Sequence, residues 1–365
     1  MMSLLTETIE KIEFIDQNWL EKAEARQLSL TKPPKSLGRL EEIANRLCAI
    51  QEKLTPLVEN RRIIICAADH GVCAENISPY PNAVTAQMVI NFLSGGAAIN
   101  AFAKIANAKL SVIDIGVKSA IPALEKIYEN SSNVLHRRRI ADGTRNFTKE
   151  PAMSEREMFA AIEVGIELAL ESKRNGETLL GLGEMGIGNT TAASAICAAL
   201  TRLAPEETTG RGTGADDEML TRKIETVRRA LAVTQPDSDD PLDVLRKIGG
   251  FEIACLVGVC VGAASEKIAI VTDGFITTAA AALAVKLCPP IAGYIFASHL
   301  SAEKGHHALL ELIDQKPLFD LEMRLGEGTG SALAMNIFAA SVAAFCEMAT
   351  FEKAGISENK QRAAR

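Results

Sequence analysis

A single carboxylate stands between two glycines in the stretch RLGEGTGSALAM, residues 324–335. Glu327 lies between Gly326 and Gly328, just ahead of an apolar, alanine-rich run. Each glycine inside a helix costs about 1 kcal/mol relative to alanine, so helix stability does not explain this composition. Two interpretations are open: a turn in which a Thr or Ser caps the helix that follows, or a general base held in a fixed position.

A second stretch, GLGEMGIGNTTAASAICAAL at 181–200, has the residue types of an anion site. Its glycines leave backbone amides uncovered just before an alanine-rich helix, and amides at a helix N-terminus bind phosphate. Lys223 follows another glycine cluster, GRGTG, and is either a solvated helix charge or a phosphate clamp. The letters GLGEMG also match the dinucleotide pattern G-x-G-x-x-G, but no ribose-binding acid follows at the usual spacing.

A third polar stretch, DHGVCAENISPYPNAVTAQM, runs from 69 to 88. Its hydroxyls, its one aromatic residue and Gln87 are suited to lining a pocket for a planar ligand; the alternative is a proline-rich loop with Tyr80 facing the core. Asp69 and His70 raise the possibility of a metal site. No H-x-x-x-H or H-E-x-x-H spacing occurs, so metal catalysis is not expected.

Apolar runs of strand length precede most of these polar stretches. They cover 63–68 and 110–115 and also lead up to Gly183, Asp273 and Ser298, with helical patterns between them. Strands that alternate with helices indicate an α/β fold with a mostly parallel sheet and helices on both faces. Ligands of such sheets bind at the carboxyl ends of the strands, so we expect the polar stretches to meet there.

Composition excludes several classes of protein. The chain has 365 residues, 47% of them hydrophobic, a net charge of −7 and 4% aromatics, which provides a large core but neither a basic face nor a stacking surface for nucleic acid. Its eight cysteines form no C-x-x-C pair and are expected to be reduced. The acidic N-terminus does not resemble a signal peptide, and the apolar run 253–265 is shorter than the ~20 residues of a membrane span. We therefore expect a soluble, cytoplasmic protein without a membrane span.

Seven motifs, in order and over nearly the whole chain, resemble the nicotinate-nucleotide:dimethylbenzimidazole phosphoribosyltransferase family. They are KPPKSLGRLE, ADHGVCAENISPYPNAVTAQMV, NFLSGGAAIN, GEMGIGNTTAASA, GRGTGADD, VTDGFITTAAAAL and RLGEGTGSALAM. The resemblance implies transfer of phosphoribose from nicotinate mononucleotide to 5,6-dimethylbenzimidazole. The products are nicotinate and alpha-ribazole 5'-phosphate, which serves the lower-ligand nucleotide loop of cobalamin. The resemblance further implies a homodimer that uses no metal and no redox cofactor.

The same resemblance implies a domain organisation and a set of site residues. A Rossmann-like large domain is expected at 59–325, and a small helical domain from 1–58 and 326–365. Glu327 matches the family's catalytic base. The nucleotide and its phosphate are expected at Glu184, Gly186, Gly188, Asn189 and Lys223, and the benzimidazole at Ser78, Tyr80, Gln87, Met88 and Leu325.

Other functions stay open at this stage. Another azole, a purine or a phenol is an alternative acceptor, and a phenol-preferring relative often works as two paired subunits. A non-catalytic nucleotide-binding protein is the alternative from another class, although a binding protein needs no base at Glu327. A dehydrogenase, based on GLGEMG alone, ranks last.

Overall fold

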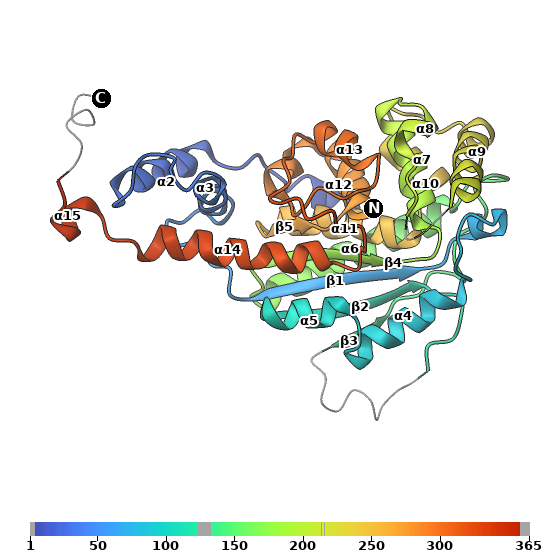
Figure 1. Ribbon diagram of the computed structural model, residues 1–365, viewed down its shortest axis with the longest axis horizontal. Helices are drawn as coiled ribbons and strands as arrows, with labels where there is room; N and C mark the ends of the chain where they lie inside the picture. Colours follow the sequence, from blue (N-terminus) through green and yellow to red (C-terminus); the bar gives the residue numbers. More distant parts are fainter. Residues whose placement is uncertain (1–3, 123–132, 213, 215, 358–365) are drawn as a thin grey trace.

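A parallel sheet of six strands is the centre of the computed structural model, which describes residues 4–122, 133–212, 214 and 216–357 (Figure 1). The strand order is β3-β2-β1-β4-β5-β6, and every neighbouring pair is parallel. The strands are β1 (Arg61–Ala68), β2 (Ala108–Gly116), β3 (Val134–Arg137), β4 (Leu179–Met185), β5 (Ala269–Thr272) and β6 (Ile295–Ala297). The predicted α/β class with a parallel sheet is confirmed.

Helices cover both faces of the sheet, which explains why the strands are apolar without alternation. On β1 every residue after Arg61 is buried, and all of β4 and β5 is buried. Helix α11 contacts β1, β2, β4 and β5 and packs on α6, whereas α4, α5 and α14 pack on strands of the sheet from the opposite side in Figure 1. Glycines allow α6 and α11 to cross closely: a Cβ on Gly165 would lie 1.9 Å from the Cys255 carbonyl oxygen.

The helices of the described chain have the following bounds. They are α1 (Leu4–Ile9), α2 (Gln17–Ser29), α3 (Arg39–Gln51), η1 (Gly71–Glu75), α4 (Ala83–Ser94), α5 (Ala98–Ile105), α6 (Glu155–Arg174), α7 (Asn189–Thr201), α8 (Pro205–Thr208), α9 (Asp217–Thr234), α10 (Pro241–Ile248), α11 (Phe251–Ser265), α12 (Phe275–Leu287), η2 (Pro289–Tyr294), α13 (His306–Leu312), α14 (Thr329–Glu347) and α15 (Phe351–Ala354).

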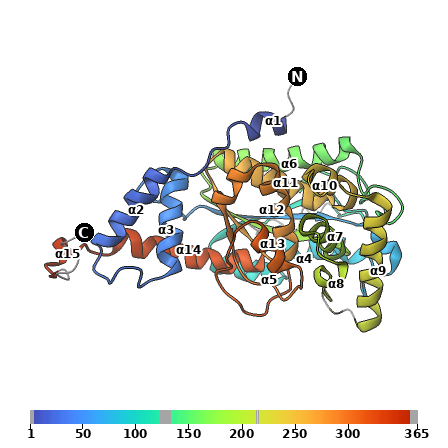
Figure 2. The ribbon, with the colours of Figure 1, turned by 90° about the horizontal axis from the view of Figure 1, so that it is seen from above.

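The two ends of the described chain pack in different places. Helices α2 and α3 lie over the distal half of α14, where Ala23, Ala44, Cys48 and Phe345 form a small cluster of their own (Figure 1). Helix α1 lies apart from them, against α6 and α11 (Figure 2). The first half of α14 contacts β4 and β5, because Ser331 at its start hydrogen-bonds carbonyls of both strands. The small domain expected from 1–58 and 326–365 stays a prediction.

Two helical segments, Ala83–Ile105 and Thr329–Glu347, are long and apolar enough to cross a bilayer by length and composition alone. The first is divided into α4 and α5 by a turn at Gly95, and the second is α14, which packs between the sheet and α3. A core helix passes the same test as a membrane span, so composition does not separate the two here.

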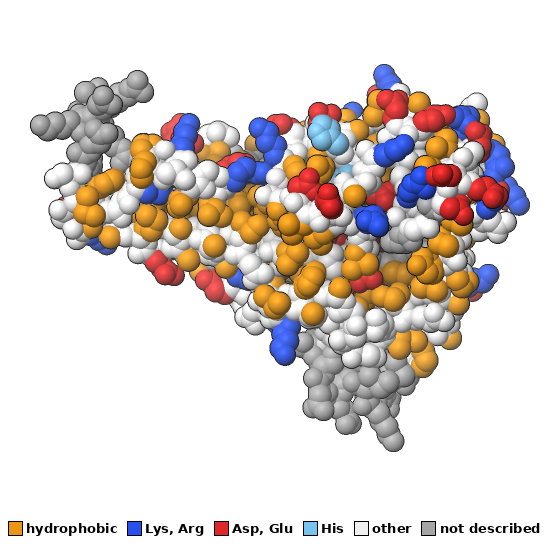
Figure 3. Space-filling view, in the orientation of Figure 1, with side chains coloured by type: hydrophobic (Ala, Val, Ile, Leu, Met, Phe, Trp, Pro, Cys, Tyr) orange, Lys and Arg blue, Asp and Glu red, His pale blue; other side chains and the backbone are white. Residues whose placement is uncertain are grey.

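Charge is unevenly distributed over the surface. In Figure 3 acidic and basic side chains gather over the α8–α9 end of the molecule, whereas the face crossed by α14 is largely apolar. The pocket described next opens between these regions, close to α7 and to the start of α14.

Candidate active site

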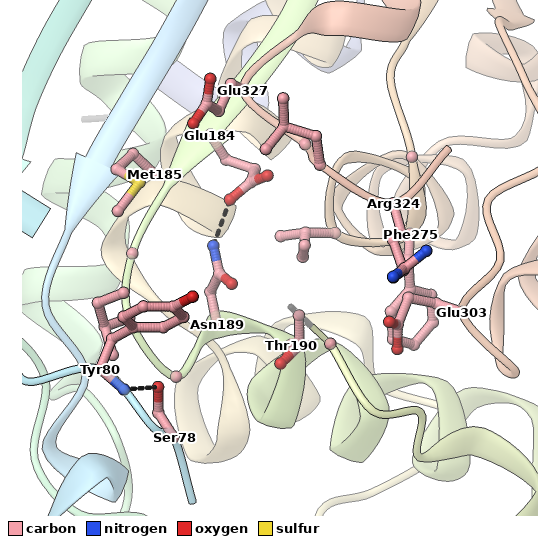
Figure 4. Close-up of a pocket in the computed structure, with 18 of the residues that line it drawn as sticks. Ser78, Tyr80, Glu184, Met185, Asn189, Thr190, Phe275, Glu303, Arg324 and Glu327 are labelled. Carbon is pink, nitrogen blue, oxygen red and sulfur yellow. Dashed lines mark hydrogen bonds between the residues drawn. The ribbon is translucent and has the colours of Figure 1, made fainter. Parts of the chain in front are cut away.

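A cavity of about 390 Å³ lies at the carboxyl ends of the central strands (Figure 4). Its walls come from the segments after β1, β4, β5 and β6, the loop before α9 and the turn that opens α14. This is the position that a parallel α/β sheet gives to its ligands. The lining includes Ser78, Tyr80, Met88, Glu184, Gly186, Gly188, Asn189, Thr190, Lys223, His299, Glu303, Arg324, Leu325 and Glu327.

Glu327 lies in a turn of three successive left-handed residues. The φ angles are +82° at Gly326, +64° at Glu327 and +85° at Gly328. A left-handed non-glycine residue costs on the order of 1–3 kcal/mol, so other contacts must hold it in place. The side chain of Thr329 does not cap α14: its hydroxyl donates instead to the Gly326 carbonyl at 2.7 Å. The interpretation of this stretch as a Thr- or Ser-capped helix start is therefore wrong.

The Glu327 carboxyl is largely removed from water, with only 7% of the residue exposed. Burial and then the nearby charge of Asp273 raise its pKa to about 7. Both causes disfavour the ionised form of a carboxyl group. A base with this pKa is half-ionised near neutral pH, which suits proton transfer at that pH.

Glu184 connects the end of β4 to two other parts of the site. Its side chain accepts a hydrogen bond from Asn189 at the start of α7 and another from the backbone N–H of Glu327 (Figure 4). Burial, followed by the charges of Asp273 and Glu252, raises the pKa of Glu184 to about 8. Near pH 7 this carboxyl therefore retains its proton most of the time and can donate a hydrogen bond.

The end of the pocket where the sequence predicts a phosphate is built around Lys223. This lysine is only 2% exposed, and its Nζ donates to Thr190 Oγ1 at 3.0 Å and to the Gly210 carbonyl at 3.1 Å. Burial lowers the pKa of Lys223, and the charge of Glu303 opposes that effect. The interpretation of Lys223 as a solvated helix charge is therefore wrong.

Fewer amides of the 186–191 loop are free than the sequence indicated. The Ile187 amide donates to Thr85 Oγ1 at 3.2 Å. The amides of Asn189 and Thr191 donate to the carbonyls of Gly186 and Gly188. These three amides are therefore not available to an anion, contrary to what the glycine composition indicates.

The apolar side of the pocket is formed by residues expected to hold the benzimidazole. Tyr80 is 47% exposed and Leu325 is 48% exposed, and both line the cavity. A core-facing Tyr80, the alternative raised by the sequence, is thus excluded. Ser78 Oγ accepts the Tyr80 backbone N–H at 3.1 Å and shapes this loop (Figure 4). Gln87 is exposed on α4 and is not among the lining residues, although Met88 next to it is.

Asp69 and His70 lie behind the pocket wall. His70 Nε2 lies 2.7 Å from Glu252 Oε1, both side chains are fully buried, and no group of three residues suited to a metal occurs in the described ranges. Burial opposes protonation of His70, but Glu252 and Asp69 together outweigh burial and raise the pKa of His70 above its usual value. The pair packs against Gly186 and Gly250, so it supports the loop that carries Gly186 and Gly188.

Sequence reasoning overlooked several lining residues. Thr190, His299, Glu303 and Arg324 all line the cavity, and none was assigned a role there. Each is next to, or within a few residues of, a strand end or motif already recognised, so position alone was the available signal. They come from three separate segments: the start of α7, the segment after β6 and the segment before the Glu327 turn, and Figure 4 labels Thr190, Glu303 and Arg324 at the pocket.

The fold and pocket define an α/β protein with a nucleotide-sized site at the carboxyl ends of its strands. A family model described as a phosphoribosyltransferase matches residues 12–356. The nicotinate-nucleotide–dimethylbenzimidazole phosphoribosyltransferase of Chloroflexus aggregans is 48% identical over 99% of this chain and 100% of its own length. That of Desulforamulus reducens is 49% identical over 98% of this chain and 100% of its own.

A solved structure agrees with these relatives. CobT from Thermus thermophilus is 44% identical and superposes with a TM-score of 0.87 over 94% of this chain and 100% of that one. The chain therefore belongs to the nicotinate-nucleotide–dimethylbenzimidazole phosphoribosyltransferase family. The resemblance seen in the seven sequence motifs is confirmed.

Proposed function

We propose that this protein transfers phosphoribose from nicotinate mononucleotide to 5,6-dimethylbenzimidazole, releasing nicotinate and forming alpha-ribazole 5'-phosphate for the nucleotide loop of cobalamin. One observation carries the proposal beyond family membership. A buried carboxyl with a pKa near 7, Glu327, lies in the same cavity as the buried cation Lys223 and the apolar rim of Tyr80 and Leu325. A base, a phosphate partner and a surface for a flat ring are the three parts that this reaction needs.

The reaction needs a base because a neutral benzimidazole carries one N–H and one lone pair. When the lone-pair nitrogen attacks ribose C1', the other nitrogen must lose its proton, and the Glu327 carboxylate accepts it. The bond between C1' and the pyridinium nitrogen of nicotinate mononucleotide breaks, and its electron pair neutralises the ring as nicotinate leaves. Attack opposite to the leaving group inverts C1' from beta to alpha.

Other residues of the cavity orient the substrates. Lys223 and the start of α7 hold the phosphate, because a buried ammonium next to Thr190 provides the charge that the loop amides lack. Asn189 and Glu184 are assigned to the nucleotide side, with Gly186 and Gly188 allowing close approach of the backbone. Ser78, Tyr80, Met88 and Leu325 bind the benzimidazole, whose flat apolar surface displaces water from C1'.

We further propose a cytoplasmic homodimer without a membrane span. The eight cysteines are all free in the structure, which suits a reducing compartment. A second copy of the chain is the simplest partner for the apolar face around α14 (Figure 3). The two-domain division, with a small helical unit completed by α14, belongs to the same proposal.

A competition assay tests the proposed function. Purified protein receives nicotinate mononucleotide and an equimolar mixture of dimethylbenzimidazole, benzimidazole, adenine and p-cresol, and products are separated by chromatography and identified by mass. We expect alpha-ribazole 5'-phosphate to dominate. Glu327→Gln should lower turnover roughly 10²–10⁴-fold while leaving nucleotide binding intact. Glu347→Gln, the same change at an exposed position at the far end of α14, the helix that follows the Glu327 turn, is the matched control.

The other outcomes decide between the alternatives. A dominant adduct of another acceptor would keep the fold and mechanism but replace the named base. Absence of nicotinate release with every acceptor, together with tight nucleotide binding, would identify a non-catalytic nucleotide-binding protein. An unchanged rate for Glu327→Gln would remove Glu327 from the role of base.

A further inference from the structure

Asp273 makes the contacts that hold the Glu327 turn. It follows β5, is 1% exposed, and directs both carboxylate oxygens at the start of α14. The Gly328 amide donates to Oδ2 at 2.8 Å, and the Gly330 amide donates to Oδ1 at 2.6 Å. A carboxylate at a helix N-terminus is favourable because it accepts free amides at the positive end of the helix dipole.

The backbone of Asp273 is itself fixed on both sides of the side chain. Its backbone N–H donates to Thr277 Oγ1 at 2.8 Å, and its carbonyl accepts Ser298 Oγ at 2.8 Å. It therefore forms a rigid anchor between the end of β5 and the first residues of α14. Because Gly328 is the residue next to Glu327, displacing this anchor changes the direction in which Glu327 points.

Asp273 also sets the charge around the base. His299 Nδ1 lies 3.8 Å from Asp273 Oδ1, yet burial lowers the pKa of His299, so this imidazole does not permanently neutralise the carboxylate. The other charged or titratable side chains on the pocket wall are Tyr80, Glu184, Arg211, Lys223, Glu303 and Arg324. Among these charged groups and Asp273, it is the charge of Asp273 that raises the pKa of Glu327, in addition to burial.

We propose that Asp273 is a positioning residue for the transfer reaction: through the Gly328 and Gly330 amides it holds Glu327 in its left-handed turn. This inference rests on the proposed function of the site. Asp273 does not line the cavity in the structure, so it acts through Glu327 and not on the substrates.

Two substitutions separate the geometry from the charge. Asp273→Asn removes the charge and replaces one acceptor oxygen by an NH₂ group that faces an amide donor. Asp273→Glu keeps the charge but moves it by one methylene. Asp240→Asn is the matched control, because Asp240 also accepts two backbone amides, those of Leu242 and Asp243, at the start of α10 and outside the pocket lining.

Both variants should lose roughly 10²-fold in kcat, since a displacement of about 1 Å is enough for that loss, with KM for nicotinate mononucleotide changed less than about threefold. In Asp273→Asn the acid limb of the kcat profile should move to lower pH, because the repulsion that raises the pKa of Glu327 is gone. In Asp273→Glu the limb should stay in place. Asp240→Asn should match the wild type in both respects.

A double-mutant cycle and a titration without turnover complete the test. In a Glu327→Gln background Asp273→Asn should cost nothing further in kcat, as expected when one residue acts through another. Carbon-13 NMR of glutamate-labelled protein, with the Glu327 signal assigned from Glu327→Gln, should show a lower titration midpoint in Asp273→Asn. This measurement keeps the inference testable even if the wild type forms no alpha-ribazole 5'-phosphate, which would refute only the proposed function.

Two results would overturn the inference. One is a folded Asp273→Asn variant with wild-type kcat and an unmoved acid limb of the kcat profile. The other is a loss in kcat on adding Asp273→Asn to Glu327→Gln that equals the loss in the wild-type background. If Asp273→Asn shows no thermal transition, Asp273→Glu decides alone. A kcat loss with an unmoved limb then supports the positioning role, and wild-type kcat refutes it.

Discussion

The raised pKa of Glu327 predicts that removing this carboxyl group stabilises the fold. The pKa of this carboxyl rises from an ordinary 4.5 to about 7 in the folded protein, so between these values the folded state holds a proton that the unfolded state has lost. Stability therefore falls as pH rises through this window. Glutamine has the shape of the protonated acid and no charge, so the stability of Glu327→Gln should not show this decrease with pH.

The expected gain depends on pH in a defined way. One pKa unit corresponds to about 1.4 kcal/mol, so the full difference is about 3 kcal/mol, which we reduce to about 2 kcal/mol for screening by solvent at the pocket mouth. Glu327→Gln should thus gain about 2 kcal/mol at pH 8.5 and about half of that at pH 5.5. For a chain of this size a gain of about 2 kcal/mol raises the thermal midpoint by a few degrees.

Denaturation of wild type and variant across pH 5 to 9 measures this effect directly. Glu347→Gln on the exposed end of α14 should give midpoints equal to the wild type at every pH. The stability difference between Glu327→Gln and the wild type could instead stay constant across the pH range or be largest at low pH. Either result would refute the raised pKa of the buried Glu327 carboxyl. Loss of turnover together with a gain in stability would show that the base is retained for catalysis alone.

Three further substitutions test the rest of the site. Lys223→Met should raise KM for nicotinate mononucleotide roughly 10–100-fold with little change in kcat, because it removes a charge-assisted contact to phosphate; steady-state kinetics that show an unchanged KM would exclude this role. Gly326→Ala should lower both kcat and the thermal midpoint, since its Cβ would lie 2.3 Å from Glu184 Oε1 at a φ of +82°. Gly355→Ala is its control in both assays, because a Cβ there meets nothing within 4 Å at a φ of +63°. Leu325→Ala should raise KM for the benzimidazole a few-fold through lost apolar contact and leave that for the nucleotide unchanged; the reverse pattern would place Leu325 on the nucleotide side.

The sequence was most informative where a residue's role follows from its immediate neighbours. The apolar run ending at Ala68 predicts a buried strand because both of its faces must be covered, and β1 is buried on both faces. The polar residues that follow strand runs predict a pocket at the carboxyl edge, and nearly all of the expected site residues line one cavity. Only one of them, Gln87, lies outside the lining. Met88 and Gln87 are adjacent on α4, and which of the two faces the cavity depends on how the helix is rotated against the sheet.

Contacts between distant segments account for what the sequence did not reveal. The Asp273 carboxylate meets the Gly328 amide across 55 positions of the chain. The Thr85 hydroxyl occupies the Ile187 amide across 102 positions and so removes one amide from the predicted anion site. Such pairings depend on the strand order, and one sequence contains no direct record of it. The residue types were visible, but their partners were not.

The glycines of GLGEMG show how two motifs far apart in the chain form one structure. A Cβ on Gly181 would lie 2.9 Å from Met335 Cε, and one on Gly183 would lie 3.0 Å from the backbone of Glu327. These glycines therefore leave space on β4 for the start of α14 and for its turn, and the packing of this turn explains them without a dinucleotide. Because Glu184 follows directly and accepts the Glu327 amide, the strand that makes room for Glu327 also orients its backbone. A residue within a helix or strand would have an ordinary, negative φ angle. The left-handed turn instead places Glu327 at the pocket wall while the residues on both sides of it remain buried or half-buried against the sheet.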